Sequence, residues 1–315
     1  MLVPCPTKAL NQGLMLILAL CTASSLLVQS APVQSSQPPA AGNSPPLGPA
    51  DSANPNGGRT IIVGDVHGRL EDFNKLIAEL KYNQTMDKVI LAGDLVAKGP
   101  DSLGVIDKAR QMGAECVRGN HDDEVLRWRG YLDSLKKTTK TDFKNEEEDE
   151  AKVPEDLIPG SEHEKLARDM TDAQYKYLSS CPLILTLPDT LSPRNAAVYV
   201  MHAGIDPAHT FKEQKPWTLF NVRNILDGVP SRKKKGSSWS KGYNEAESKR
   251  VQKGAEGHLV VYGHDAGRGL NNQKWSIGLD TGCVKGNQLS AYIVEQDKVV
   301  SIDCGKASEG DDGDD

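Results

Sequence analysis

The sequence has few cysteines, no excess of positive charge and a modest share of apolar residues. Six cysteines in 315 residues are too few for a fold held together by disulfides. The formal net charge of −6 gives no general reason to expect a nucleic-acid partner. A hydrophobic fraction of 38% beside a charged fraction of 25% favours a soluble globular protein over a bundle of membrane helices. A chain of this length can bury a sizeable core in one large domain or two small ones.

One apolar run at the N-terminus differs in kind from the rest of the chain. Residues 13–28 read GLMLILALCTASSLLV, with Lys8 before them and no acidic residue until Asp51. This layout predicts that residues 1–30 are a secretory signal peptide, with a signal anchor that crosses the membrane once as the alternative. Residues 31–58 are rich in Pro, Ser, Gly and Ala, and we expect a disordered linker there.

The N-terminus also predicts where the folded part of the chain works. A signal-like segment indicates the lumen of the secretory pathway, with the vacuole favoured and secretion as the alternative. The single sequon, which begins at Asn83, fits a glycoprotein of that compartment. Residues 306–315 are acidic and are expected to be a solvated, disordered tail. The folded domain should therefore span 59–305, with membrane contact only through an uncleaved N-terminal segment.

From Arg59 onward short apolar strands alternate with amphipathic helices. The first three expected strands lie in TIIVGDVHG, DKVILAGD and AECVRGN, with a helix after each. Strands that alternate with helices predict an α/β fold with a parallel sheet of βαβ units. Residues 135–170 are mostly polar and are expected to be a surface insertion, followed by a helix near 171–179 and a mostly β second half.

Polar residues stand where five of the expected strands end. In chain order they are Asp65, His67, Asp94, Asn120, His121, His202 and His264. Because the carboxyl ends of strands in an open α/β sheet share one edge, loops there can join residues two hundred positions apart. Carboxylates, imidazoles and a carbonyl oxygen are together the ligand set of divalent metals, and the adjacent glycines allow close approach. One such residue alone is usually a turn or a satisfied polar group, but the full set predicts a metal site.

The motifs GDVHG, GDLVAKGP, RGNHD, HAG and GH, in this order, resemble those of the calcineurin-like metallophosphoesterase superfamily. The resemblance covers roughly residues 60–303. The longer flanks PWTLFNVRNI, VVYGHDAGRGL and GLDTGCVKGNQLSAYIVE resemble the fungal zinc-dependent vacuolar endopolyphosphatases and their relatives. The resemblance implies a four-layer α-β-β-α sandwich with a dinuclear metal site at the carboxyl ends of the strands.

The resemblance also implies a role for each motif residue. Asp94 would bridge two divalent metal ions, with Zn²⁺ favoured and Mn²⁺, Co²⁺ or Fe as alternatives. The other ligands would be Asp65 and His67 for the first ion, and Asn120, His202 and His264 for the second. A hydroxide that bridges the ions would then attack phosphorus.

The residues after the second motif depart from one branch of the superfamily. Protein serine/threonine phosphatases usually carry Asp-Arg where this chain has Ala97-Lys98. Lys98 supplies positive charge as a point donor, unless it is only a turn residue, and Ala97 cannot orient a histidine. His121 is still expected to be the general acid that protonates the leaving oxygen, with Asp122 or Asp123 as candidate partners.

The favoured function is metal-dependent hydrolysis of phosphoanhydride bonds, with inorganic polyphosphate as the leading substrate. A leaving group that is itself a phosphate needs little help from an acid. The basic run Arg232–Lys235 could form a track for a polyanion, or it is a solvated loop. The expected substrate-binding residues are Lys98, Asn120, His121, Lys241 and Arg268. The alternatives are a dinucleoside polyphosphate hydrolase, a serine/threonine protein phosphatase and, in another class, a metal-bearing scaffold without catalysis.

A few other residues carry structural expectations. Asp206 and Asp280 are expected to fix turns rather than bind metal, and Trp217 and Trp239 are expected to be packing residues. Four cysteines could form one or two disulfides, with the pairing left open: Cys116, Cys181, Cys283 and Cys304.

Overall fold

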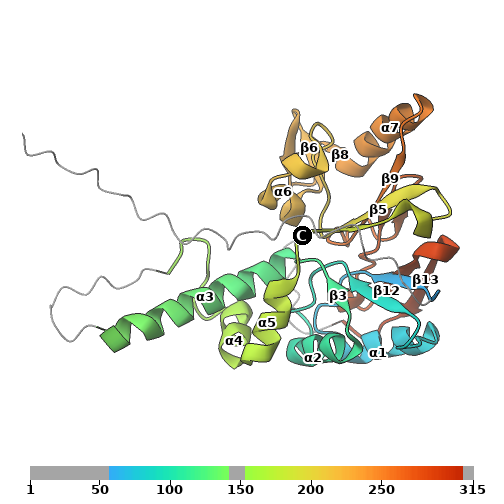
Figure 1. Ribbon diagram of the computed structural model, residues 1–315. Helices are drawn as coiled ribbons and strands as arrows, with labels where there is room; N and C mark the ends of the chain where they lie inside the picture. The colour runs from blue at the N-terminus through green and yellow to red at the C-terminus, as the bar shows by residue number, and fades with distance from the viewer. Residues whose placement is uncertain (1–56, 142–152, 308–315) are drawn as a thin grey trace, which may run out of the picture. The chain divides into compact units, whose positions relative to one another are not determined.

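The computed structural model describes residues 57–141 and 153–307 (Figure 1). The expected signal segment, nearly all of the expected linker and the end of the acidic tail lie outside the described residues. The first described strand begins at Thr60 and the last ends at Asp303. In the described ranges, no helix combines the length and the apolar character that a membrane crossing requires.

The first sheet contains the predicted βαβ units. Strands β1 (Thr60–Val63), β2 (Lys88–Leu91) and β3 (Glu115–Cys116) are parallel neighbours. Helices α1 (Leu70–Glu79) and α2 (Ser102–Met112) connect them. Two antiparallel strands complete the order β13-β12-β1-β2-β3, namely β12 (Gln288–Ile293) and β13 (Lys298–Asp303). The prediction of a parallel βαβ arrangement is thus confirmed for the first half of the chain.

The second sheet comes from the later part of the chain and has the order β10-β11-β9-β5-β4. Its strands are β4 (Ile184–Leu187), β5 (Ala196–Met201), β9 (Gly257–Tyr262), β10 (Asn271–Asn272) and β11 (Ser276–Gly278). Strands β5, β9 and β11 run parallel, and β4 and β10 are antiparallel edges. Helix α7 (Trp239–Gln252) contacts this sheet.

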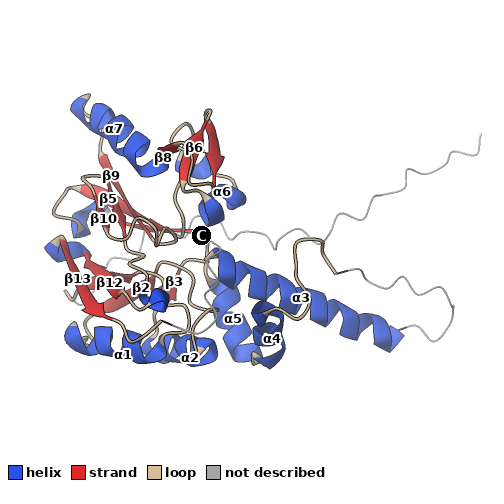
Figure 2. Cartoon of the chain, turned by 180° about the vertical axis from the view of Figure 1, so that it is seen from behind, coloured by secondary structure: helices blue, strands red, loops and turns tan. Residues whose placement is uncertain are grey.

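Two apolar clusters hold the layers together. Neighbouring residues of β1 point to opposite faces: Ile61 packs among the side chains of α1 and α2, whereas Ile62 packs against the second sheet. Trp239 of α7 belongs to the same cluster as Ile62. Both views show α1 and α2 along one sheet and α7 along the other (Figure 1, Figure 2). The layers therefore run helix, sheet, sheet, helix, which confirms the predicted four-layer sandwich.

Three helices follow β3. They are α3 (Asn120–Thr141), α4 (Glu162–Asp169) and α5 (Asp172–Ser180). Residues 142–152 of the expected polar surface insertion at 135–170 lie outside the described residues. In the described remainder, α4 packs along α3 and buries Ala167, and Leu157 and Met170 are also buried. The sequence did not reveal α4 as a packed helix, because most of its residues are polar and only a few of its side chains face the core.

A small three-stranded sheet lies between β5 and α7 in the chain. It consists of β6 (Asn224–Leu226), β7 (Val229–Ser231) and β8 (Ser237–Ser238), preceded by α6 (Pro216–Asn221). Short 3₁₀ helices lie at η1 (Asp189–Leu191), η2 (Phe211–Glu213), η3 (Cys283–Lys285) and η4 (Val294–Gln296). Trp239 is buried, as expected of a packing residue, whereas Trp217 of α6 is 48% exposed.

The four cysteines that follow the signal-like segment form two disulfides. Cys116 of β3 pairs with Cys181, which follows α5, and closes a loop with a sequence separation of 65. Cys283 of η3 pairs with Cys304, which follows β13, over a separation of 21. The first bond ties the α4–α5 segment to the sheet, and the second ties the C-terminal strand to η3.

The two disulfides should stabilise the fold by different amounts. A longer closed loop removes more entropy from the unfolded chain, which gives about 4 kcal/mol for the separation of 65 and about 3 kcal/mol for 21. We expect Cys116→Ala/Cys181→Ala to lower the free energy of unfolding by about 1 kcal/mol more than Cys283→Ala/Cys304→Ala. Urea denaturation without reductant measures both losses. A larger loss for the second pair would contradict the loop-length argument.

Candidate active site

The motif residues lie in loops that follow five strands of the two facing sheets. Asp65 and His67 follow β1, Asp94 follows β2, and Asn120 lies just after β3. His202 and His264 follow β5 and β9 in the second sheet. The structure brings all six predicted metal ligands together, because these strand ends meet where the sheets face each other.

The backbone at this edge adopts conformations that most residues avoid. His67, Asp94 and His264 have φ angles of 44°, 48° and 68°, in the left-handed region. Gly119 and Gly263 are equally required, because a Cβ on Gly119 would collide with the Asp94 carboxylate and one on Gly263 with the Asp65 carboxylate. Strain of this kind persists only where the surroundings enforce it, and it concentrates at functional sites.

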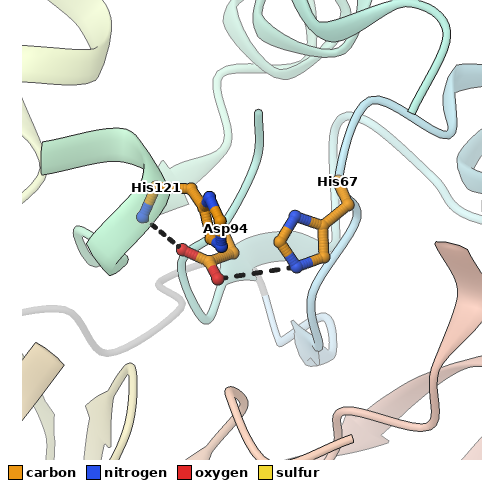
Figure 3. Close-up of side chains that lie close together, drawn as sticks. All are labelled: His67, Asp94 and His121. Carbon is orange, nitrogen blue, oxygen red and sulfur yellow. Dashed lines mark hydrogen bonds and ion pairs between the residues drawn. The ribbon is translucent and has the colours of Figure 1, made fainter. Parts of the chain in front are cut away.

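Asp94 lies at the centre of the cluster and is 2% exposed. Its Oδ2 is 3.5 Å from His67 Nε2 and 3.3 Å from His202 Nε2. Its Oδ1 accepts a hydrogen bond of 3.0 Å from the backbone N–H of His121 (Figure 3). One carboxylate thus connects loops that follow β1, β2, β3 and β5.

Backbone carbonyls orient two of the histidines. His67 Nδ1 lies 3.1 Å from the carbonyl of Val96, and His202 Nδ1 lies 3.1 Å from the carbonyl of Ala92. A carbonyl only accepts, so each Nδ1 carries a proton. Burial lowers the pKa of His202, but the nearby Asp94 carboxylate outweighs burial and raises that pKa above its ordinary value, which favours a second proton on Nε2. His67 stays neutral, and its Nε2 presents a lone pair toward Asp94. This is the arrangement in which a histidine is ready to bind a metal ion.

Asn120 and Asp65 complete the cluster. Asn120 Oδ1 is 2.9 Å from His202 Nε2 and 3.2 Å from His264 Nδ1. Both oxygens of Asp65 accept from the backbone N–H of His264, at 3.1 and 3.0 Å. His67 Nε2 lies 4.0 Å from Asp65 Oδ2. The first and last motifs of the chain are therefore joined directly.

Burial sets the protonation states in the cluster. It lowers the pKa of His67 to about 4 and the pKa of His264 well below its ordinary value, so both imidazoles are neutral at neutral pH. Burial raises the pKa of Asp65 well above its usual range, and the charges of Asp280 and Asp94 raise it further. Asp94 differs from Asp65. Burial raises its pKa, but the charges of His202 and His121 outweigh burial and hold the pKa well below its usual range.

The residues fit a pair of metal ions that share Asp94. Two groups of side chains could each hold an ion, because the potential ligand atoms within each group all lie within 4.8 Å of one another. The groups are His67–Asp94–His121 and Asp94–His202–His264. Neutral imidazoles and a carboxylate are the form in which these side chains bind divalent metals. His264 Nε2 is buried without a hydrogen-bond partner in the described part of the chain, as expected of a group whose partner is an ion.

A cavity of about 720 Å³ opens beside this cluster. His67, Asp94 and His264 line it, together with seven basic side chains. The seven are Lys98, Arg223, Arg232, Lys233, Lys234, Lys235 and Lys285. Arg223 and Lys285 were not predicted, although both lie in the sequence flanks PWTLFNVRNI and GLDTGCVKGNQLSAYIVE. The cavity therefore presents positive charge next to the metal-binding cluster.

Two predicted substrate ligands do not line the cavity. Lys241 is exposed on α7 and is not among the lining residues. The guanidinium of Arg268 binds Asp265, the Oδ1 of Asn224 at 2.6 Å and the carbonyl of Arg223 at 3.1 Å. Arg268 therefore braces the loop that carries Arg223, and the roles of Arg268 and Lys241 in substrate binding stay predictions.

The candidate partners of His121 also need correction. Asp122 accepts from the backbone N–H groups of Leu95 and Gly119, at 3.0 and 2.9 Å, and so ties the second and third motifs together. Asp123 pairs with two arginines. His121 Nδ1 instead lies 2.8 Å from Nε2 of His163. Composition alone gave no signal for His163, which lies 42 positions away in the expected insertion.

The two aspartates assigned to turns behave as expected. Asp280 Oδ1 accepts from the backbone N–H of Gly282 at 3.1 Å, and Asp206 Oδ1 accepts from that of Ala208 at 3.0 Å. Asp280 in addition lines the cavity. Its charge therefore acts on the metal-binding cluster as well as on the turn.

Known proteins are similar to this chain in sequence and in fold. Residues 58–268 match the family described as calcineurin-like phosphoesterase. The chain is 30% identical to a zinc-dependent endopolyphosphatase of Saccharomyces cerevisiae, over 75% of this chain and 76% of that protein. It is 27% identical to an asymmetrical bis(5'-nucleosyl)-tetraphosphatase of Oceanobacillus iheyensis, over 76% and 90%. A solved structure described as a candidate diadenosine tetraphosphatase has a TM-score of 0.62 at 28% identity and covers 80% of this chain and 96% of its own.

Removal of the shared carboxylate should affect metal binding more than removal of a ligand from one side. We expect Asp94→Ala to lose both ions, and His67→Ala to lose mainly one. Metal analysis after equilibration with Zn²⁺ measures the content of each variant. His209→Ala is the control, because His209 is exposed and its ring pairs with Asp206, away from the cluster. An Asp94→Ala protein that keeps two ions per chain would show that this carboxylate is not shared.

Proposed function

Because the chain belongs to the calcineurin-like phosphoesterase family and is thus a metallophosphoesterase, we propose that it hydrolyses phosphoanhydride bonds within inorganic polyphosphate. The observation that supports this substrate is the row of basic side chains that lines the cavity beside the metal-binding cluster. Polyphosphate carries about one negative charge per phosphate, so a long substrate gains from positive charge beyond the reacting group.

The basic side chains come from four separate loops or turns. Lys98 follows β2, Arg223 precedes β6, Arg232–Lys235 lie between β7 and β8, and Lys285 ends η3. The run Arg232–Lys235 is exposed, and Lys98 is half-buried. A phosphate at the cluster would therefore meet Lys98, while further phosphates of the same chain would meet the exposed run.

The cluster can position a phosphate and cleave its bond. Two bound ions would supply an acidified water as nucleophile and neutralise the charge on the phosphate oxygens. Asp94, with the Nε2 atoms of His67 and His202, would hold the ions, and Lys98 would hold a phosphate oxygen. As the new P–O bond forms, the bond to the leaving phosphate breaks. The leaving oxygen would keep the electron pair of the broken bond and take a proton from His121.

Zinc is the metal that we propose for the site. The side-chain donors are mainly imidazole nitrogens and carboxylate oxygens, a set that suits zinc but also manganese and iron. A zinc-dependent relative supports the choice of zinc.

A dinucleoside polyphosphate hydrolase is the second candidate. It is supported by the tetraphosphatase relative and by the structure described as a candidate diadenosine tetraphosphatase. Both substrates contain phosphoanhydride bonds and carry negative charge, so the same cluster and the same Lys98 would serve either. Comparison of product release from long-chain polyphosphate and from diadenosine tetraphosphate decides between the two.

We further propose that the folded domain works in the lumen of the secretory pathway, most naturally the vacuole. Two disulfides support this, because disulfides persist in oxidising compartments. Asn83 supports it too, because it lies exposed in the loop between α1 and β2. The N-terminal segment that would direct the chain there lies outside the described residues.

Lys98 and the exposed basic run should affect different substrates. Lys98→Ala should lower the rate on both tripolyphosphate and long-chain polyphosphate, by roughly ten- to a hundredfold, because a hydrogen bond to a charged group is worth about 1.5–3 kcal/mol. Alanine at all four positions of Arg232–Lys235 should lower only the rate on the long chain. That loss should shrink as salt rises, since exposed charges are screened.

A variant with matched charge serves as the control for the run. Lys212, Lys215, Lys249 and Lys253 are exposed and do not line the cavity, so their quadruple alanine variant should behave like the wild type. Equal losses on both substrates for the Arg232–Lys235 variant would rule out a track for long chains. An unchanged rate for Lys98→Ala on both substrates would make Lys98 a turn residue only.

Glycosylation tests the proposed location. Asn83 is exposed, so a chain that enters the secretory pathway should carry a glycan there. Treatment with a glycosidase should increase the electrophoretic mobility of the wild-type chain and leave Asn83→Gln unchanged. A full-length chain found unglycosylated in the cytosol would contradict the proposal.

A further inference from the structure

We propose that His163, backed by Glu124, positions His121 to deliver a proton to the leaving oxygen. This inference rests on the role of His121 in the proposed function. His163 is a positioning residue in this scheme, because it acts through His121.

The three side chains form a continuous row. His121 Nδ1 is 2.8 Å from His163 Nε2, and the two rings are stacked with centroids 5.1 Å apart and an interplanar angle of 15°. His163 Nδ1 is 3.4 Å from Glu124 Oε1. The His163 side chain is only 15% exposed, so water competes little for these contacts.

The chemistry of each atom determines which one donates and which one accepts each hydrogen bond in this row. A carboxylate only accepts hydrogen bonds, so Glu124 favours the proton of His163 on Nδ1. His163 Nε2 then carries a lone pair and accepts from His121 Nδ1–H. Nε2 of His121 remains free to hold the proton that is transferred.

The fold supplies this partner from the segment expected to be an insertion. Ser161 caps α4 by accepting from the backbone N–H of Glu164, and this cap places His163 in the first turn of the helix. The preceding residue, Glu162, accepts from the backbone N–H of Lys98 at 2.9 Å. The first turn of α4 therefore contacts both the turn after β2 and the start of α3, where His121 and Glu124 lie.

Other groups near His121 cannot take the place of His163. Ala97 has no polar side-chain atom. Asp122 is occupied by two backbone N–H groups, and Asp123 pairs with Arg118 and Arg127. The His163 ring is thus the polar group that meets His121 Nδ1.

The proton transfer balances without any further reactant. The bond between phosphorus and the leaving oxygen breaks, and the oxygen keeps the electron pair. It takes the proton of His121 Nε2, which leaves His121 neutral with its Nδ1–H still held by His163. Water returns the proton before the next turnover. His163 and Glu124 keep their protonation states throughout.

Leaving groups of different acidity test the positioning role on the metal-loaded enzyme. Phenyl phosphate has a basic leaving group that needs a proton, whereas p-nitrophenyl phosphate has an acidic one that needs little help. We expect His163→Ala to lower kcat on phenyl phosphate by roughly a hundredfold, near the lower end for acid catalysis, with KM little changed. The loss on p-nitrophenyl phosphate should be several times smaller. His163→Gln, which keeps an acceptor, should restore most of the rate, and Glu124→Gln should show a weaker form of the same pattern.

His258→Ala is the matched control. His258 is also half-buried and faces a glutamate, with Nδ1 3.7 Å from Glu247 Oε1, but it does not line the cavity. This variant should leave the ratio of the two rates as in the wild type. Equal losses on both esters for His163→Ala would overturn the proposal.

Two measurements do not depend on turnover. Metal analysis should find the wild-type ion content in His163→Ala, and loss of an ion would instead make His163 part of the metal site and overturn the proposal. Nitrogen-15 NMR of labelled histidines should show a protonated, hydrogen-bonded Nδ1 in His121 that changes in His163→Ala. An unchanged His121 signal would also overturn it. Should the wild type cleave neither ester, the NMR result alone decides the positioning role, and the activity on polyphosphate decides the proposed function separately.

Discussion

The buried carboxylate of Asp94 is the constraint on which the rest of the site depends. It is 2% exposed, so a charge there is tolerated only with partners that compensate for lost water. The loops after β1, β3 and β5 supply them through His67, the backbone of His121 and His202. To hold the carboxylates in place, the neighbouring backbone adopts left-handed conformations, and glycines stand where a Cβ would collide with a carboxylate. These features have no evident structural benefit of their own, and they make sense together as a frame for two ions.

Around this acidic centre the protein arranges charge of the opposite sign. The chain as a whole is acidic, with a net charge of −6, yet seven basic side chains line the cavity. They are carried mostly by the small sheet between β5 and α7, outside the two large sheets. The large sheets therefore hold the reacting centre, while a separate, smaller element provides attraction for an anion.

The α4–α5 segment links stability with the site. A disulfide fastens its end to β3, only a few residues before Asn120. Its beginning contacts the turn of Lys98 through Glu162 and the ring of His121 through His163. A segment held at both ends in this way keeps the His163 ring beside His121. The polar segment is thus part of the working structure.

Much of the fold and the metal-binding cluster could be predicted from the sequence. Alternating strands and helices gave the βαβ half, and polar residues at strand ends gave Asp65, His67, Asp94, Asn120, His202 and His264, which the structure brings together. Such predictions succeed because parallel strands must share an edge, so local pattern carries spatial information. Other features could not be predicted this way. They are the partner of His121, the cavity residues Arg223 and Lys285, the cysteine pairs, and the positions of Lys241 and Arg268 outside the cavity lining. Each depends on which segments far apart in the chain pack together, and only the tertiary structure decides that, because charge and polarity in a sequence do not specify a direction in space.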